Sequence, residues 1–149
     1  KYSKYNNFLF LGRGQLYPIA MEGALKMKEL AYIHAEGYSA GEMKHGPIAL
    51  IDAQMPTIFI ATNEKLFDKI YSNVEQVKAR KGKVIAIVQK GEKRMNKLAN
   101  DVIEIPKVTA SQSPIITVVV LQLLAYHIAN KLGKNIDRPR NLAKTVTVE

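Results

Sequence analysis

Cysteine is absent from the 149-residue sequence. Its absence excludes a disulfide scaffold, a thiolate metal site and a cysteine nucleophile. A secretory signal is also absent, because the first residues, KYSKYNNFLF, contain no long apolar run that ends in small residues. We therefore expect a protein of the cytoplasm. Because the first residue is not methionine, we also expect the chain to be a piece of a longer one.

Acidic residues are in the minority, with 13 Asp and Glu against 22 Lys and Arg and a formal net charge of +9. This balance fits a solvated basic surface, small anionic substrates such as phosphates, or nucleic acid. The sequence has no zinc-finger spacing, no RNP-like aromatic motif and no arginine-rich arm. Since the lysines are also scattered, we expect no nucleic-acid partner.

Only one long apolar run occurs, over residues 115–132. It contains Thr117, Gln122, His127 and Lys131, which are polar. The run is short for a bilayer span of ~20 residues, so we expect a helix buried in a core and no membrane partner. Ser113 is its expected cap and Gly133 its expected end. His127 is expected to make a hydrogen bond in the core.

Short apolar runs alternate with helical patterns along the chain. The expected strands cover residues 8–12, 57–62, 84–89 and 101–106. The expected helices cover residues 17–33, 64–80, 91–99 and 114–132. This alternation predicts a mostly parallel sheet with helices on both faces, a three-layer α/β/α sandwich of the flavodoxin-like or Rossmann-like kind. We expect one domain over residues 1–149, with an irregular tail over 134–149.

A glycine-containing turn, GRG at residues 12–14, follows the first expected strand. In α/β folds, ligands bind beyond the carboxyl ends of the strands, and a turn into a helix start is a natural anion site. The motif is not the full GxGxxG fingerprint. The sequence therefore leaves two interpretations open, a phosphate loop and a tight strand-to-helix turn.

The densest cluster of ionisable groups lies in residues 22–46, EGALKMKELAYIHAEGYSAGEMKHG. Within the helix expected there, Lys26 and Glu29 are at positions i and i+3, so their side chains are neighbours. As an ordinary surface ion pair they would contribute roughly 0.3–0.5 kcal/mol. As a functional pair they would present a carboxylate base beside a cation.

Glycines interrupt the helical pattern after this pair, and we expect a tight, irregular loop over residues 34–50. His45 precedes Gly46-Pro47 and is expected on a turn, where it is a candidate functional residue. His34 is expected to be structural. The spacing of His34 and His45, without an HExxH motif, does not indicate zinc, so the sequence predicts no metal site and no cofactor.

Two motifs carry a resemblance to a known family. They are LGRGQLYPIAMEGALKMKELAYIHAEGYSAGEMKHGPIALID at residues 11–52 and RPRNLAKTVTVE at residues 138–149. Together they resemble the carboxyl-terminal half of the isomerase domain in the glucosamine-6-phosphate synthase family, the isomerising glutamine–fructose-6-phosphate aminotransferases. The resemblance covers almost the whole chain and is looser in the middle helices.

The resemblance implies a sugar-isomerase (SIS) domain, the second of two in an enzyme that begins with a glutaminase domain. It implies that fructose-6-phosphate and glutamine-derived ammonia become glucosamine-6-phosphate. The implied partners are the upstream SIS domain, the glutaminase domain and a second copy in a homodimer. The chain has no counterpart of the Ser/Thr-rich loop that holds the sugar phosphate in the upstream domain, so it corresponds to only part of the site.

Specific roles follow from the resemblance, residue by residue. Glu29 corresponds to the carboxylate that moves a proton between carbon 1 and carbon 2 of the open-chain sugar. Lys26 corresponds to a neighbouring lysine that keeps the carboxylate ionised or stabilises developing negative charge. His45 corresponds to the histidine linked to ring opening, which the family contributes across the dimer interface.

The tail also corresponds to functional residues of the family. Lys144 matches the lysine that forms a Schiff base with the ketose carbonyl, for which the amine must be neutral. Leu142 and Ala143 match the segment that lines the ammonia route and contacts the sugar. Without the resemblance, Lys144 would be interpreted as a solvated lysine.

Two other functions stay open from the sequence alone. One is a SIS module that senses sugar phosphates without turnover, since a fold does not decide a function. Glu29 and Lys144 argue against it, because a sensor has no need of a base and an amine nucleophile. The other is a basic nucleic-acid-binding domain, which rests on the net charge alone.

Overall fold

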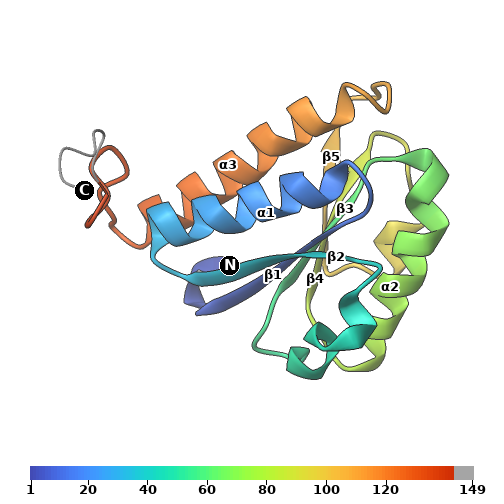
Figure 1. Ribbon diagram of the computed structural model, residues 1–149, viewed down its shortest axis with the longest axis horizontal. Helices are drawn as coiled ribbons and strands as arrows, with labels where there is room; N and C mark the ends of the chain where they lie inside the picture. The colour runs from blue at the N-terminus through green and yellow to red at the C-terminus, as the bar shows by residue number, and fades with distance from the viewer. Residues whose placement is uncertain (143–149) are drawn as a thin grey trace.

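The computed structural model describes residues 1–142 and contains one five-stranded parallel sheet in the order β2-β1-β3-β4-β5 (Figure 1). The strands are β1 (Asn7–Gly12), β2 (His34–Ser39), β3 (Thr57–Ala61), β4 (Val84–Gln89) and β5 (Asp101–Ile105). Because every pair is parallel, each connection returns from the carboxyl end of one strand to the amino end of the next.

Three α-helices cover the two faces of the sheet, α1 (Leu16–Lys26), α2 (Phe67–Ala79) and α3 (Ser113–Lys131). α1 and α3 lie together on one face and α2 lies on the other (Figure 1). The remaining helical turns are short: η1 (Tyr2–Lys4), η2 (Met27–Ala31), η3 (Met43–His45), η4 (Pro47–Leu50), η5 (Glu64–Leu66) and η6 (Met95–Lys97). The three-layer α/β/α prediction is confirmed.

Each strand contributes to two cores, because successive side chains point to opposite faces. Along β1, Phe8 and Phe10 pack with α1 and α3, whereas Leu9 and Leu11 pack with α2. β3 and β4 alternate in the same way, and both are buried along their whole length. This double burial explains why the inner strands are continuous apolar runs in the sequence.

Two local predictions were wrong. The loop expected after residue 33 is the edge strand β2, which pairs only with β1 and buries only Ala35. Its sequence, HAEGYS, lacks the apolar run of an inner strand because both of its faces are partly exposed. The helix expected over residues 91–99 is a single 3-10 turn, η6, held down by the buried Met95.

α3 was predicted to be a helix buried in the core, and this was wrong for one of its faces. By length and composition α3 could span a membrane, yet it packs on α1 with one face while Ile115 on the other is 66% exposed. Ser113 does not cap the helix: it is the first helical residue, and its buried hydroxyl is bonded to Thr62. His127 is exposed beside Tyr126, and its side chain makes no hydrogen bond to the described residues.

Gly37 in β2 allows the strand to lie against α1, and we predict that Gly37→Ala destabilises the fold by about 1–3 kcal/mol. A Cβ at this position would lie 2.5 Å from the Cα of Met21, which is backbone and has no freedom to rotate away. Urea denaturation of the wild type and the variant measures the change.

Gly41→Ala is the matched control for this experiment. A Cβ there would meet its nearest heavy atom, Nη1 of Arg13, at 3.4 Å, and the glycine does not have a left-handed backbone. We expect a change of less than about 1 kcal/mol in either direction. Equal stability of Gly37→Ala and the wild type would contradict the close approach of α1 and β2.

Candidate active site

The end of α1 is held close to its neighbours by a glycine. A Cβ at Gly23 would lie 2.8 Å from Cδ1 of Leu121 in α3 and 3.0 Å from Cδ1 of Phe10 in β1. No larger residue fits at Gly23, so α1 packs closely against both β1 of the sheet and α3. The ionisable residues of the next turn are placed by this packing.

α1 widens after Lys26 into the π-helical turn η2, which contains Glu29. Single π-helical turns are rare in proteins and occur frequently at functional sites. The turn ends at Tyr32, whose backbone is left-handed with φ 58°. A left-handed conformation at a residue other than glycine costs free energy and persists only where the surroundings hold it.

The predicted pairing of Lys26 and Glu29 is confirmed. Nζ of Lys26 lies 2.7 Å from Oε2 of Glu29 and 3.5 Å from Oε1 of Glu22, and about a third or less of each of these side chains is exposed. The hydrogen bond to Glu29 raises the pKa of Lys26 above its ordinary value. Lys26 is therefore a permanent cation near neutral pH, and it holds the Glu29 carboxylate in one orientation.

Glu29 also lines a cavity of about 440 Å³ between η2 and the carboxyl-terminal tail. The cavity is lined by Leu25, Lys28, Glu29, Tyr32, Ile33, His34, Arg140, Asn141 and Leu142. Two of the residues implied by the resemblance, Glu29 and Leu142, thus lie along one cavity. Ala143 and Lys144 follow Leu142 directly in the chain but lie outside the described residues.

Tyr32 connects this cavity to the tail. Its hydroxyl accepts a hydrogen bond of 2.8 Å from the backbone N–H of Arg140, and the Arg140 guanidinium lies 4.4 Å from the centre of its ring. Lys134 lies over the same ring at 5.4 Å. The sequence analysis missed these contacts, because nothing in the pattern links residues that are 108 positions apart.

His45 does not join this cavity within one chain. It lies on the exposed turn η3, which follows the carboxyl end of β2, whereas His34 at the first position of β2 lines the Glu29 cavity. Six strand residues at ~3.3 Å each separate the two ends of β2. Among residues 1–142, no His, Asp and Glu side chains gather as a possible metal site.

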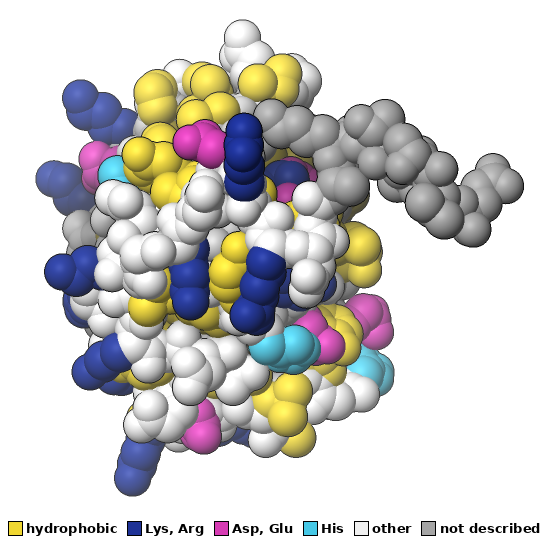
Figure 2. Space-filling model, turned by 90° about the vertical axis from the view of Figure 1, so that its left-hand side faces the viewer, with side chains coloured by type: hydrophobic (Ala, Val, Ile, Leu, Met, Phe, Trp, Pro, Cys, Tyr) yellow, Lys and Arg dark blue, Asp and Glu magenta, His cyan; other side chains and the backbone are white. Residues whose placement is uncertain are grey.

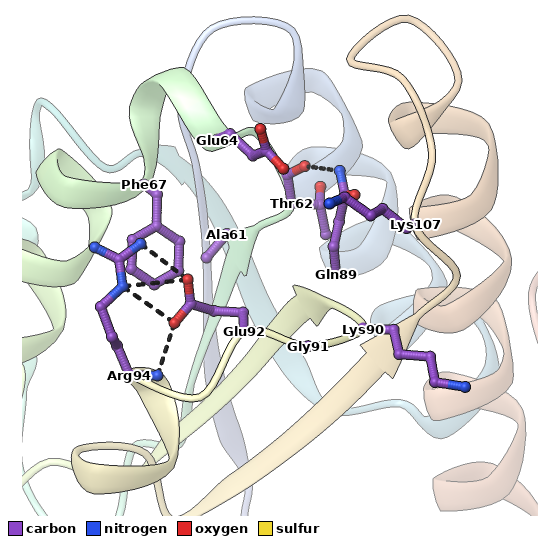
Figure 3. Close-up of a pocket in the computed structure, with 10 residues that line it drawn as sticks. All are labelled: Ala61, Thr62, Glu64, Phe67, Gln89, Lys90, Gly91, Glu92, Arg94 and Lys107. Atoms are coloured by element: carbon purple, nitrogen blue, oxygen red, sulfur yellow. Dashed lines mark hydrogen bonds and ion pairs between the residues drawn. The ribbon is translucent and has the colours of Figure 1, made fainter.

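A second cavity of about 400 Å³ lies at the carboxyl ends of β3 and β4 (Figure 3). Arg94 lies over the ring of Phe67 at 4.0 Å and pairs with Glu92 and Asp68, each at 2.9 Å. The amide of Gln89 bonds to backbone groups of Thr62 and Val108. These polar groups satisfy one another, so this cavity is the weaker candidate.

On the face that Figure 2 shows, the described Lys and Arg side chains form no single stripe. Figure 2 shows dark-blue Lys and Arg side chains spread over the visible face rather than gathered in one block. A spread of this kind is typical of a solvated basic surface. It gives the nucleic-acid interpretation no support.

Comparison with known proteins shows which family this chain belongs to. The family model for the SIS domain matches residues 1–131. This chain belongs to the SIS domain family. The SIS domain fold also occurs in the tagatose-6-phosphate ketose/aldose isomerase from Escherichia coli, a crystal structure that matches at a TM-score of 0.77 with 21% identity and covers 97% of this chain and 40% of that one.

Relatives with higher sequence identity to this chain are named as aminotransferases. The glutamine–fructose-6-phosphate aminotransferases (isomerizing) of Bacteroides thetaiotaomicron and Aquifex aeolicus are 60% and 59% identical over 97% and 100% of this SIS domain. The SIS domain spans 24% and 25% of their lengths, about a quarter of each. The carboxyl-terminal domain of the Francisella tularensis aminotransferase matches at a TM-score of 0.84 with 43% identity, covering 92% of this chain and 39% of that one.

We predict that Tyr32→Phe loosens the tail. The substitution removes the acceptor for the Arg140 N–H and keeps the ring, and one hydrogen bond contributes roughly 0.5–1.5 kcal/mol. Trypsin should therefore cleave after Arg140 about two- to tenfold faster, as measured by mass spectrometry of the released peptide.

Tyr126→Phe is the control, because Tyr126 is exposed on α3 and is not the acceptor of the Arg140 N–H. Its cleavage rate should equal that of the wild type. Cleavage of Tyr32→Phe at the wild-type rate would show that the hydroxyl does not hold the tail.

Proposed function

We propose that this SIS domain is the isomerase part of a glutamine–fructose-6-phosphate aminotransferase. In this proposal it helps to convert fructose-6-phosphate and ammonia to glucosamine-6-phosphate. The observation that carries the proposal is the Glu29 carboxylate, held by Lys26 at 2.7 Å and facing a cavity that the tail also lines. The names of the relatives at 59–60% identity support the same reaction.

Glu29 is the proposed base for the proton transfer. Once ammonia has replaced the carbonyl oxygen at carbon 2 as an imine, the Glu29 carboxylate takes a proton from carbon 1. The electron pair of that C–H bond forms the C1–C2 double bond, while the C=N pair moves to the nitrogen, which takes up a proton and gives an enolamine. Glu29 then returns its proton to carbon 2, and the carbon-1 hydroxyl gives up a proton that replaces the one taken up by nitrogen, which leaves the amino aldose. One carboxylate serves both carbons because they are adjacent on one face of the sugar.

Lys26 supplies charge in this scheme and does not act as a nucleophile. An amine must be neutral to attack a carbonyl, and the hydrogen bond to Glu29 raises the pKa of Lys26. Lys144 is therefore the better candidate for the Schiff base with the ketose. It follows Leu142 by two positions, and Leu142 lines the Glu29 cavity.

His45 is proposed to act from a second copy of the chain. Its place beyond the carboxyl end of β2 keeps it from the Glu29 cavity of its own chain. A homodimer would let it reach the sugar of its partner, for ring opening. The upstream SIS domain is proposed to hold the phosphate of the sugar, and the glutaminase domain to supply the ammonia. The whole enzyme is proposed to act in the cytoplasm and to need no cofactor.

We predict that Glu29→Gln lowers glucosamine-6-phosphate formation at least about 100-fold in the proposed longer enzyme. Acid–base catalysis contributes about 10²–10⁴-fold, and glutamine is a similar shape that cannot accept the proton. Binding of fructose-6-phosphate, measured by calorimetry, should change by less than about threefold, since the pocket keeps its shape.

Glu22→Gln is the matched control, because Glu22 lies on the same helix and also faces Lys26, at 3.5 Å. Its activity should stay within about threefold of the wild type. Wild-type turnover in Glu29→Gln would contradict the role of Glu29. Tight sugar-phosphate binding without turnover in the wild type would favour the sensor function instead.

A further inference from the structure

A cationic cavity of about 270 Å³ lies apart from the Glu29 site, between α2 and the loops that follow β1 and β2. It is lined by Arg13, Gly41, Lys44, Lys69, Ser72, Asn73 and Gln76. Three of these side chains are cations and none is a carboxylate. The cavity shares no lining residue with the Glu29 cavity.

Arg13, the arginine of the GRG turn, is held in place without being neutralised. Its Nε and Nη2 donate to Oδ1 of Asn73 at 3.3 and 3.1 Å, and Asn73 is only 4% exposed. An amide oxygen orients a guanidinium but leaves its full positive charge available. Arg94, by comparison, pairs with two carboxylates.

The other two cations converge on the same space from different elements. Lys44 comes from η3, and Lys69 comes from the first turn of α2. Within the described part of the chain, Arg13, Lys44 and Lys69 have no carboxylate within ion-pair distance. Three like charges around one small cavity repel one another, so an anion between them would be stabilised.

A neutral acceptor completes the lining. The Oε1 of Gln76 is buried and has no hydrogen-bond partner among the described residues. A buried acceptor without a partner costs free energy, which a ligand with an O–H donor would recover. An anion that also carries a hydroxyl would satisfy both the cations and this acceptor.

We propose that this cavity, the Arg13 site, binds the phosphate group of a small phosphate or phosphate monoester. A phosphate carries up to two charges on oxygens arranged in three dimensions, which suits three cations from three elements better than a planar carboxylate does. Cavities for drug-sized ligands measure about 300–1,000 Å³, so 270 Å³ suits a smaller ligand. The site lies at the carboxyl edge of the sheet, where parallel α/β folds bind ligands.

The test is a titration of the complete, ¹⁵N-labelled 149-residue chain with inorganic phosphate at about pH 8, where phosphate is a dianion. We expect saturable shifts of the backbone amides of Gly41, Ser72 and Asn73. Arg13→Gln and Lys69→Gln should each weaken binding at least about tenfold, because each removes a charged donor. The second variant keeps the Arg13–Asn73 contact intact, and the dispersion of the amide resonances shows that each variant is folded.

Lys97→Gln is the matched control, because it removes one exposed lysine that does not line the cavity. It should bind phosphate within about twofold of the wild type. Acetate should not saturate the site. Equal weakening in all three variants, unchanged affinity in Arg13→Gln and Lys69→Gln, or equal binding of acetate would overturn the proposal.

Two further ligands identify the source of the phosphate. Glucose-6-phosphate binding more tightly than methyl phosphate, with the advantage lost in Gln76→Leu, would support the site and assign it to a hydroxyl-bearing phosphate monoester. Equal binding of inorganic phosphate, methyl phosphate and glucose-6-phosphate would support the site and assign it to the phosphate group alone.

Discussion

The close packing of α1 between the sheet and α3 is the constraint on which the rest of the site depends. At Gly23 and Gly37 there is no space for a Cβ, because side chains or backbone of the neighbouring elements lie within 3 Å of its position. α1 therefore has one position, and the π-helical turn that continues it presents Glu29 at a fixed place. Lys26 orients the carboxylate, and Tyr32 joins the same turn to the tail.

Burial decided which parts of the fold could be predicted from the sequence. β3 and β4 are buried on both faces, so their apolar runs in the sequence identify them. β2 is an edge strand with one buried residue, and its Gly and polar residues resemble a loop. α3 is apolar on both sides but packs on only one of them, which composition alone does not reveal.

The candidate site also has contacts that the sequence predicts and contacts that it does not. The contact between Lys26 and Glu29 follows from helical spacing and could be predicted. The contact between Tyr32 and Arg140 depends on where the tail returns after α3, and no local pattern contains that information. The Arg13 site is a mixed case, because the GRG turn left an anion site open as one of two interpretations, but its proposed binding groups are side chains from three separate elements.

The most direct test of the account is borohydride trapping with fructose-6-phosphate in the longer enzyme proposed to contain this domain, followed by peptide mapping. The account predicts a reduced sugar adduct on Lys144 and none on Lys26, because Lys144 follows the Leu142 that lines the Glu29 cavity whereas Lys26 stays protonated. An adduct on Lys26, or none on Lys144 when sugar binding is confirmed separately, would contradict a sugar site formed by Glu29 and the tail.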